Sequence, residues 1–313
     1  MHILVTGGAG FIGSHIVDAL VERGDRVTVV DNLSTGSLNN LNPQVQFFPL
    51  DIRDERMQEV FQQSHVDGVI HQAAQISVSR SMEFPLEDAQ INVEGTIRLL
   101  ELSRQHGVGR FLFASSAAVY GEPEGLPIGE TVSLQPFSPY GISKMAGEHY
   151  VTAYGRNYGL KTTVLRYGNV YGPRQIAKGE GGVVAIFCEK ISHHENPCIQ
   201  GDGKQTRDFI YVKDVAQANL AALDSSASGV FNVGTQQETS VEFLLLAMEE
   251  ALNKKITPEY GPAREGDIRF SFLNCEKAQQ QLGWSPRYSL TEGLKETWGH
   301  YQELAGRRPL DAD

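Results

Sequence analysis

The chain has 313 residues and a formal net charge of −11, with 41% hydrophobic and 21% charged residues. This length allows one large domain or two unequal ones, and this composition is that of a globular protein with a substantial core. The excess of negative charge argues against nucleic acid as a partner, and no apolar run approaches the roughly 18 residues that a membrane span needs.

The first predicted element is an apolar strand followed by a glycine-rich turn. The strand is expected at His2–Thr6, almost at the first residue, which leaves no room for a cleavable signal before it. The turn places glycines at Gly7, Gly10 and Gly13. Glycines in this pattern permit a tight turn, close approach of the backbone to a pyrophosphate and close packing of the next helix. That helix, predicted over residues 12–21, presents an N-terminus that favours an anion.

A second predicted strand, Arg26–Val30, runs directly into an acidic residue. Asp31 follows Gly13 by 18 residues, near the spacing of the carboxylate that binds adenosine ribose hydroxyls in dinucleotide-binding folds. The same carboxylate would repel a 2′-phosphate, which favours NAD over NADP. A glycine turn alone also occurs without a nucleotide, but the ordered series of strand, glycines, helix, strand and acid favours a dinucleotide site.

Strands and helices continue to alternate through the first half of the chain. This pattern predicts an α/β fold of the doubly wound, Rossmann type, in which helices cover both faces of a parallel sheet. The further strands are expected at Val45–Pro49, Gly68–His71, Arg110–Ala114 and Thr162–Arg166, and the main helices between them at Pro85–His106 and Pro139–Tyr158.

The second of those helices carries a tyrosine and a lysine four residues apart. Ser138 and Pro139 are expected to begin the helix, so Tyr140 and Lys144 share one of its faces. A nearby cation favours the phenolate, so a tyrosine with an ordinary pKa of about 10 can act as a base near neutrality. Taken alone, the tyrosine and lysine could equally be spaced by chance on a solvated helix. The glycine-rich turn at the start of the chain favours a catalytic role for the pair.

After about residue 169, glycine and proline interrupt the pattern. Helices are still predicted at Val183–His193, Lys213–Ala222, Val241–Leu252 and Cys275–Leu282. We therefore predict an NAD-binding domain of residues 1–168 plus about 205–235, and a smaller, discontinuous substrate domain of about 169–204 and 236–306. The three cysteines are odd in number and lack metal-site spacing, which predicts reduced thiols, no metal and a cytoplasmic protein.

The order of these motifs resembles that of the nucleotide-sugar epimerases, a branch of the extended short-chain dehydrogenase/reductase family typified by the UDP-glucose 4-epimerases. The resemblance covers nearly the whole chain. It rests on Thr6–Gly13, Val30–Ser34, Leu50–Asp51, His71–Ala74, Asn92–Thr96, Ser115–Gly121, Tyr140–Lys144, Arg166–Pro173, Gly201–Val212 and Arg264–Asp267.

The resemblance implies a NAD-dependent 4-epimerisation of a UDP-hexose through a transient 4-keto sugar, with NAD tightly bound because each turnover regenerates it. In the implied mechanism Tyr140 takes the proton of the C4 hydroxyl, Ser116 shares a hydrogen bond with that oxygen, and Lys144 binds the nicotinamide ribose. From the residues alone, Ser116 could equally cap a turn. The implied cofactor-binding residues are Gly7, Gly10, Phe11, Ile12, Gly13, Asp31, Asn32, Asp51, Ile52, Ala73, Ala74, Asn92, Ser115, Tyr140 and Lys144.

The resemblance also implies a set of substrate-binding residues. Two of them are arginines, whose guanidinium groups suit the diphosphate of a nucleotide sugar. Relatives often carry an aromatic residue in place of Gln200, and a small residue such as Ser271 is associated with admission of N-acetylated sugars, so UDP-GlcNAc and UDP-GalNAc are also expected to fit. The full set is Ser116, Asn169, Val183, Gln200, Arg207, Arg264 and Ser271.

Several alternatives share this fold. Ala117 and Ala118 stand where 4,6-dehydratases carry an acidic pair, which argues against dehydration. Asn169 and Ile176 stand where UDP-glucuronate 4-epimerases tend to carry threonine and arginine, which favours a neutral hexose, although Arg174 is near. A net NAD-dependent oxidoreductase and a non-catalytic NAD-binding regulator stay open, but such regulators commonly lose the Ser/Tyr/Lys set.

Members of this family often form homodimers through two helices of each subunit. Here those helices would be Pro85–His106 and Pro139–Tyr158. The apolar side chains on the first are compatible with an interface but also with packing on the protein's own sheet; they include Ile91, Ile97, Leu99 and Leu100.

Overall fold

The centre of the molecule is a seven-stranded parallel sheet with the order β11-β6-β5-β4-β1-β2-β3. The computed structural model describes residues 1–123, 125–177, 182–263 and 268–307. The strands of the sheet are β1 (His2–Thr6), β2 (Arg26–Val30), β3 (Gln46–Phe48), β4 (Gly68–His71), β5 (Arg110–Ser116), β6 (Lys161–Tyr167) and β11 (Gly229–Val233). The predicted doubly wound sheet is thereby confirmed.

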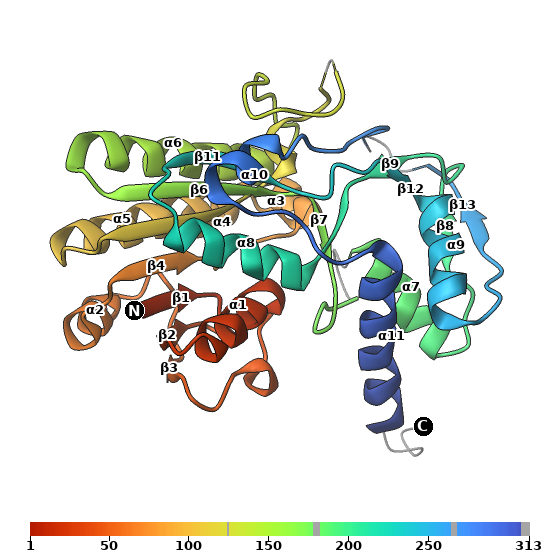
Figure 1. Cartoon of the computed structure of the whole chain (residues 1–313), viewed down its shortest axis with the longest axis horizontal. Helices are drawn as coiled ribbons and strands as arrows, with labels where there is room; N and C mark the ends of the chain where they lie inside the picture. Colours follow the sequence, from red (N-terminus) through yellow and green to blue (C-terminus); the bar gives the residue numbers. More distant parts are fainter. Residues whose placement is uncertain (124, 178–181, 264–267, 308–313) are drawn as a thin grey trace.

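Helices cover both faces of this sheet, as Figure 1 shows. One face is covered by α1 (Phe11–Glu22) and α8 (Val212–Asp224), and the other by α2 (Met57–Ser64), α5 (Gly95–Gln105) and α6 (Pro139–Tyr158). Every residue of β1 is buried, as expected for a central parallel strand that is covered on both faces. Its three middle residues form the apolar run that such burial favours. The short helices α3 (Val78–Glu83) and α4 (Pro85–Ala89) precede α5.

The strand order reverses at β1, whose neighbours are β2 on one side and β4 on the other. The loops that leave these strands at their carboxyl ends therefore turn in opposite directions and leave a crevice between them. The turn after β1 stays tied to the sheet, because Gly7 N donates to Val30 O at 2.8 Å. This crevice is where a doubly wound sheet places its ligands.

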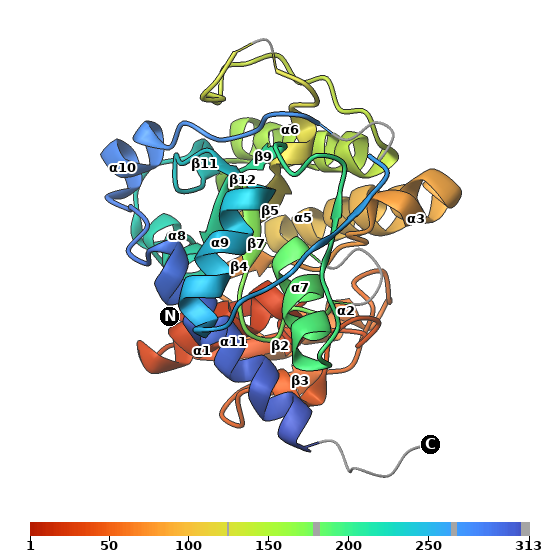
Figure 2. The same ribbon diagram turned by 90° about the vertical axis from the view of Figure 1, so that its right-hand side faces the viewer.

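A second apolar cluster lies beside the carboxyl edge of the sheet, at the right of Figure 1 and in front in Figure 2. It is built from α7 (Val183–Ser192), α9 (Val241–Leu252) and α11 (Leu290–Arg307), and α10 (Glu276–Leu282) packs beside β11. Three two-stranded sheets complete this part: β7 (Asn169–Tyr171) with β10 (Phe209–Tyr211), β8 (Cys198–Gln200) with β13 (Glu259–Gly261), and β9 (Thr206–Arg207) with β12 (Thr239–Ser240).

Among the differences from the sequence prediction, two concern helices. The helix expected over Pro85–His106 is interrupted by a π-helical turn at Gln90–Glu94, between α4 and α5. In addition α11, a helix of 18 residues, was not predicted. The two-domain division proposed from the sequence stays a prediction, although β11 does return to the first sheet beside β6. None of the helices in the described ranges combines the length and apolarity that crossing a membrane requires.

Candidate active site

A cavity of about 660 Å³ opens at the crevice beside β1. This volume is within the range of roughly 300–1,000 Å³ that small-molecule and cofactor sites occupy. Its walls come from the ends of β1, β2 and β4 and from the segment before α3. Eleven of the residues predicted to bind the cofactor line it, namely Gly7, Gly10, Phe11, Ile12, Gly13, Asp31, Asn32, Asp51, Ile52, Ala73 and Ala74.

The three glycines of the first turn are required for different reasons. Gly7 has φ +71°, and a Cβ there would lie 2.6 Å from Ala73 N. A Cβ on Gly13 would overlap the carbonyl oxygen of Gly7. A Cβ on Gly10 would instead have one non-adjacent neighbour within 4 Å in the described part of the chain, which is the same carbonyl oxygen of Gly7 at 3.2 Å. The fold needs Gly7 and Gly13, whereas Gly10 keeps the cavity open where a pyrophosphate would approach the backbone.

Asp31 is held rigidly at the end of β2. Its Oδ2 accepts from Ala9 N at 3.0 Å, and its Oδ1 accepts from Leu33 N at 2.8 Å. Each carboxylate oxygen can accept a further hydrogen bond, and the side chain lines the cavity. A buried, preoriented carboxylate in this position suits the hydroxyls of an adenosine ribose.

Asp51 and Asn32 form the polar rim of the same end of the cavity. Asn32 Nδ2 donates to Asp51 Oδ2 at 2.9 Å, and Arg53 Nε donates to Asp51 Oδ1 at 2.8 Å. These hydrogen bonds from Arg53 lower the pKa of Asp51 to about 2. Ile52 is buried beside them and offers an apolar surface. Together with the glycine turn and Asp31, these residues fit a dinucleotide that crosses the switch point of the sheet.

Tyr140 and Lys144 lie in the first two turns of α6, whose start the sequence predicted correctly. Ser138 caps the helix by accepting from Gly141 N at 3.1 Å, and proline occupies the first helical position. Lys144 Nζ lies 6.0 Å from the centre of the Tyr140 ring and donates to Ala114 O at 2.9 Å. That carbonyl belongs to β5, so the helix face and the strand end meet at one place.

Ser116, at the end of β5, contacts the same tyrosine. Its Oγ accepts from Ala118 N at 3.2 Å and so caps the short 3₁₀ turn that follows β5. A side-chain hydrogen bond also joins it to Tyr140. The two interpretations of this serine that the sequence left open are therefore compatible, because one hydroxyl both caps the turn and reaches the phenol.

The ionisation of Tyr140 differs from the expectation drawn from its spacing to Lys144. Burial raises the pKa of Tyr140, the charge of Asp88 acts in the same direction, and the hydrogen bond from Ser116 lowers it. Burial also lowers the pKa of Lys144 to about 8, against the opposing charges of Asp88 and Glu148. The lowering predicted for the tyrosine does not arise from the protein's own groups, because desolvation of the phenolate is the largest influence on its pKa.

Asn92 lies in the π-helical turn and is buried in a network of hydrogen bonds. It donates to Gln75 O at 2.9 Å, to Ser143 Oγ at 3.1 Å and to Asp88 Oδ1 at 3.1 Å, and it accepts from Gln75 N at 2.8 Å. Gln75 and Asp88 were not predicted as site residues. The position of Asp88, four residues before Asn92 on a predicted helix, was the signal that could have identified it.

The hydroxyl of Ser115 is engaged in a buried network at the end of β5. The hydroxyl donates to Glu148 Oε1, which also accepts from Arg166 Nε at 2.8 Å. Glu148 and Arg166 form a buried ion pair at 2.6 Å that joins α6 to β6. The side chain of Ser115 thus supports the site through Glu148, and its contact with the cofactor stays a prediction.

The predicted substrate residues come from several segments near the carboxyl edge of the sheet. Asn169 is exposed, and its N–H donates to the carbonyl of Asp208, the neighbour of Arg207, at 2.7 Å. Gln200 and Ser271 contact the same stretch: Gln205 Nε2 donates to Gln200 O at 2.7 Å, and Ser271 N to Thr206 Oγ1 at 3.4 Å. Val183 begins α7 against the second apolar cluster, and Arg264 lies outside the described residues.

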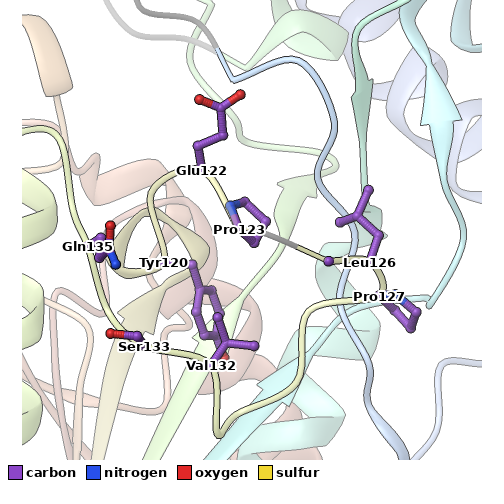
Figure 3. A pocket seen from close by; sticks show the side chains of 9 residues that line it. Tyr120, Glu122, Pro123, Leu126, Pro127, Val132, Ser133 and Gln135 are labelled. Atoms are coloured by element: carbon purple, nitrogen blue, oxygen red, sulfur yellow. The ribbon is translucent and has the colours of Figure 1, made fainter.

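A second cavity, of about 560 Å³, lies inside the loop that follows the 3₁₀ turn after β5. Figure 3 shows its lining side chains, which include Tyr120, Leu126, Val132 and Gln135. Among the residues that the structure describes, none lines both this cavity and the cofactor cavity. Tyr120 forms part of the wall of this cavity and is held in place because its hydroxyl donates to Asn232 Oδ1 at 2.6 Å.

In the described ranges, no group of three or more His, Cys, Asp or Glu side chains is arranged to hold a metal ion.

Known proteins resemble the chain over nearly its full length. A putative UDP-glucose 4-epimerase of Methanocaldococcus jannaschii is 49% identical over 94% of this chain and 96% of its own length. The crystal structure of UDP-glucose 4-epimerase with UDP-glucose from Thermotoga maritima matches with a TM-score of 0.94 and 47% identity, covering 97% of this chain and 99% of that one. UDP-glucose 4-epimerase of Thermus thermophilus, in complex with NAD, matches with a TM-score of 0.90 and 46% identity, covering 96% and 99%.

A family model gives the same assignment from the pattern of residues. The model of the NAD dependent epimerase/dehydratase family matches residues 3–234, which include the glycine turn, Asp31, Ser116, Tyr140 and Lys144. Both comparisons agree with the dinucleotide-type cavity and the tyrosine–lysine pair described above. The chain belongs to the NAD dependent epimerase/dehydratase family.

Proposed function

We propose that the protein is a NAD-dependent 4-epimerase that interconverts UDP-glucose and UDP-galactose. The observation that carries this proposal is the meeting of Ser116, Tyr140 and Lys144 at the carboxyl edge of the sheet, on which a dinucleotide-type cavity also opens. The similarity to UDP-glucose 4-epimerases supports the choice of substrate.

The proposed chemistry assigns proton transfer to the phenol. When bound, NAD supplies the redox step, because it can take a hydride from C4 of the sugar and return it to either face. Tyr140 accepts the proton of the C4 hydroxyl and gives it back. Ser116, which is already hydrogen-bonded to the phenol, can contact the same sugar oxygen and relay the proton.

The proposed role of Lys144 is to orient the cofactor ribose and to hold a positive charge beside the phenol. With a pKa of about 8, its ammonium group is still mostly protonated at neutral pH. Its bond to Ala114 O fixes Nζ between β5 and α6, so the charge is preoriented and does not have to reorganise during the reaction.

The substrate's diphosphate needs cations in a protein of net charge −11. We propose that Arg207 binds this diphosphate. The segment that carries Arg207 is fixed by the buried carboxylate of the next residue, because Asp208 accepts from Thr235 N at 2.7 Å and from Leu273 N at 3.2 Å. Arg264 is proposed as a second cation on sequence grounds. The exposed Asn169 is proposed to contact the sugar.

A second candidate substrate class is the N-acetylated hexoses. Ser271 lies on the segment that hydrogen-bonds to Thr206, next to Arg207, and its side chain is small and only partly buried. A small residue at this position leaves room for an acetamido group. UDP-GlcNAc is therefore the second substrate to compare, and a much larger kcat/KM for it than for UDP-galactose would make it the main substrate.

The test is conversion of UDP-galactose by the purified protein, with and without added NAD, followed by NMR of the sugar nucleotides. We expect a mixture of UDP-glucose and UDP-galactose to form without net NADH. Tyr140→Phe keeps the ring but removes the acidic proton, and we expect it to lower kcat by about 10³-fold while NAD binding persists. Accumulation of free NADH would indicate a net oxidoreductase, and NAD binding without turnover would indicate a regulator.

We further propose that the protein forms a homodimer through α3, α4 and α6. These helices pack on one another and expose apolar side chains at Met82, Phe84, Leu86 and Ile142. Leu99 and Leu100, considered from the sequence, are instead fully buried on the protein's own sheet. An exposed apolar patch of this kind favours a protein–protein contact.

Light scattering tests the dimer, because the mass should be twice the chain mass of 34.4 kDa. Leu86→Lys, at a side chain that is 71% exposed, is expected to give monomers. The matched control is Leu246→Lys on α9, where the leucine is 59% exposed and outside the proposed interface. A mass of one chain for the wild type would refute the dimer.

We also propose a cytoplasmic location. The thiols of Cys188, Cys198 and Cys275 are all free, as reducing compartments keep them. Fractionation of cells that express the protein would test this, and recovery from a secreted or periplasmic fraction would contradict it.

A further inference from the structure

A buried carboxylate, Asp88, lies beside the proposed catalytic residues without a part in the mechanism above. It is on α4, one helical turn before Asn92, and 1% of its surface is exposed. Its Oδ1 accepts from Gln75 Nε2 at 2.8 Å and from Asn92 Nδ2 at 3.1 Å. Its Oδ2 has no hydrogen-bond partner in the described part of the chain. An unsatisfied buried carboxylate oxygen destabilises a fold, which points to a use other than packing.

The contacts of Asn92 show what Oδ1 of Asp88 holds in place. Asn92 Nδ2 contacts Ser143 Oγ at 3.1 Å, and Ser143 Oγ in turn donates to Tyr140 O at 3.0 Å. Gln75, which donates to Asp88, lines the cofactor cavity and is bonded to Asn92 through its backbone. Asp88 therefore fixes a chain of polar groups that runs from the cavity wall to the first turn of α6.

The charges around Lys144 show what Oδ2 contributes. The Tyr140 ring lies 6.0 Å from Lys144 Nζ, the charges of Asp88 on α4 and Glu148 on α6 raise the pKa of Lys144, and the charge of Lys144 lowers the pKa of His71 on β4. Glu148 is already paired with Arg166 at 2.6 Å. His71 is neutral near pH 7, because burial lowers its pKa to about 3. Within the described residues, Asp88 is the carboxylate near Lys144 that has no ion-pair partner of its own.

We propose that Asp88 is a positioning residue of the active site, which orients Asn92 through Oδ1 and supplies through Oδ2 the negative charge that balances the Lys144 ammonium group. This inference rests on the proposed epimerase function. On this proposal, α4 and the π-helical turn contribute to the active site as well as to the packing of the fold.

The sign of the expected effect follows from the two neighbours. The charge of Asp88 raises the pKa of Lys144 and also that of Tyr140. Activity at low pH is limited by protonation of the tyrosine, and activity at high pH by loss of the lysine proton. Asp88→Asn removes the charge, while its carbonyl oxygen can still accept both hydrogen bonds of Oδ1. Both limbs of the pH profile should therefore move to lower pH, by roughly one unit.

The experiment is the pH dependence of kcat/KM for UDP-galactose in the wild type, Asp88→Asn and Asp88→Glu. We expect Asp88→Glu to restore the limbs toward those of the wild type, with a lower kcat because the longer side chain displaces Asn92. The matched control is Glu83→Gln, which removes the same charge from the exposed end of α3 and should leave both limbs unmoved. A lower kcat for Asp88→Asn with unmoved limbs would show a merely structural role and overturn the proposal.

A second readout separates this inference from the function on which it rests. If the wild type binds NAD but does not epimerise, Tyr140 can be titrated directly by NMR with ¹³Cζ-labelled tyrosine, its signal assigned by Tyr140→Phe. The signal should titrate roughly one unit lower in Asp88→Asn. If that variant does not fold, Asp88→Ser, smaller and also neutral, should show the same shift. Failure of both neutral variants to fold, while Asp88→Glu folds, would place the carboxylate in folding and overturn the proposal.

Discussion

At the scale of single residues, the first turn separates what the fold needs from what a ligand needs. Gly13 is in contact with the backbone of Gly7, and no side chain fits between them. Gly10 has an extended backbone with φ −79°, which alanine adopts without strain, and a methyl group there would make one tight contact, with Gly7 O at 3.2 Å. The pattern of three glycines therefore combines two structural positions with one that serves the cavity.

We expect Gly13→Ala to lower the stability of the protein and Gly10→Ala to lower its affinity for NAD. Gly13→Ala should destabilise the protein by roughly 3 kcal/mol, because the backbone must move apart. Gly10→Ala should change stability by less than about 1 kcal/mol, because the gain from restricting the unfolded chain offsets the poorer helix cap. It should nevertheless weaken NAD binding about tenfold or more, a difference of ~1.4 kcal/mol. Urea unfolding measures the change in stability, and calorimetric titration with NAD measures the change in affinity. If Gly10→Ala bound NAD as tightly as the wild type, the role of Gly10 in the cofactor cavity would be contradicted.

At the scale of elements, α6 and β5 bring the reactive groups together. Ser138 ends the preceding loop and caps the helix, so Tyr140 and Lys144 lie in its first two turns, where fraying would begin. The bond from Lys144 to Ala114 O and the buried pair of Glu148 with Arg166 then clamp the helix to the two strands beneath it. The geometry of the catalytic pair therefore depends on how firmly this helix begins.

Ser138→Ala tests that dependence. Loss of the cap should lower the free energy of unfolding by about 1 kcal/mol, and kcat should fall about tenfold because Tyr140 is less well held. The matched control is Ser240→Ala, which removes the equivalent cap of α9, where Ser240 Oγ accepts from Phe243 N at 3.1 Å. It should lose similar stability with kcat unchanged. Equal losses of kcat in the two variants would mean that the cap acts only through global stability.

At the scale of the whole molecule, contacts between distant segments hold α1 against the chain that follows β7. His15 on α1 bonds through Nε2 to Pro173 O at 3.0 Å, and Arg174 pairs with Asp18 at 2.8 Å. Burial lowers the pKa of His15 to about 4. The neutral imidazole is thus part of the native structure, and protonating it opposes folding.

Acid should therefore destabilise the protein above the range in which carboxylates titrate. Since the folded pKa of His15 is below its unfolded value of about 6.5, the unfolded chain binds more protons between these values. Stability should fall as the pH drops from about 6.5 to about 4, with His15 contributing roughly 3 kcal/mol and His71 acting in the same direction. Urea unfolding at several pH values measures this loss. In His15→Gln, the loss of stability between these pH values should be smaller by the amount that His15 contributes. If the pH dependence of stability were unchanged in this variant, His15 would be excluded as a source of the loss.

Local patterns in the sequence predicted much of this protein. The strand at His2–Thr6, the glycine turn and the start of α6 at Ser138 depend on residues within a few positions of one another, so propensity, capping and i, i+4 spacing suffice to find them. The alternation of strands and helices along the first half of the chain likewise predicted the parallel sheet. For the same reason the sequence placed Tyr140 and Lys144 on one helix face.

The tertiary structure decided what depends on segments far apart in the chain. The hydroxyl of Ser115 turns to Glu148, 33 residues away, and His15 meets Pro173, 158 residues away; no local rule pairs these groups. The π-helical turn that buries Asn92, and the burial that raises the pKa of Tyr140, likewise arise from packing between helices and sheet. Side-chain direction and desolvation are properties of the assembled core, so the sequence determined which groups are present and the fold determined which way they face and how they ionise.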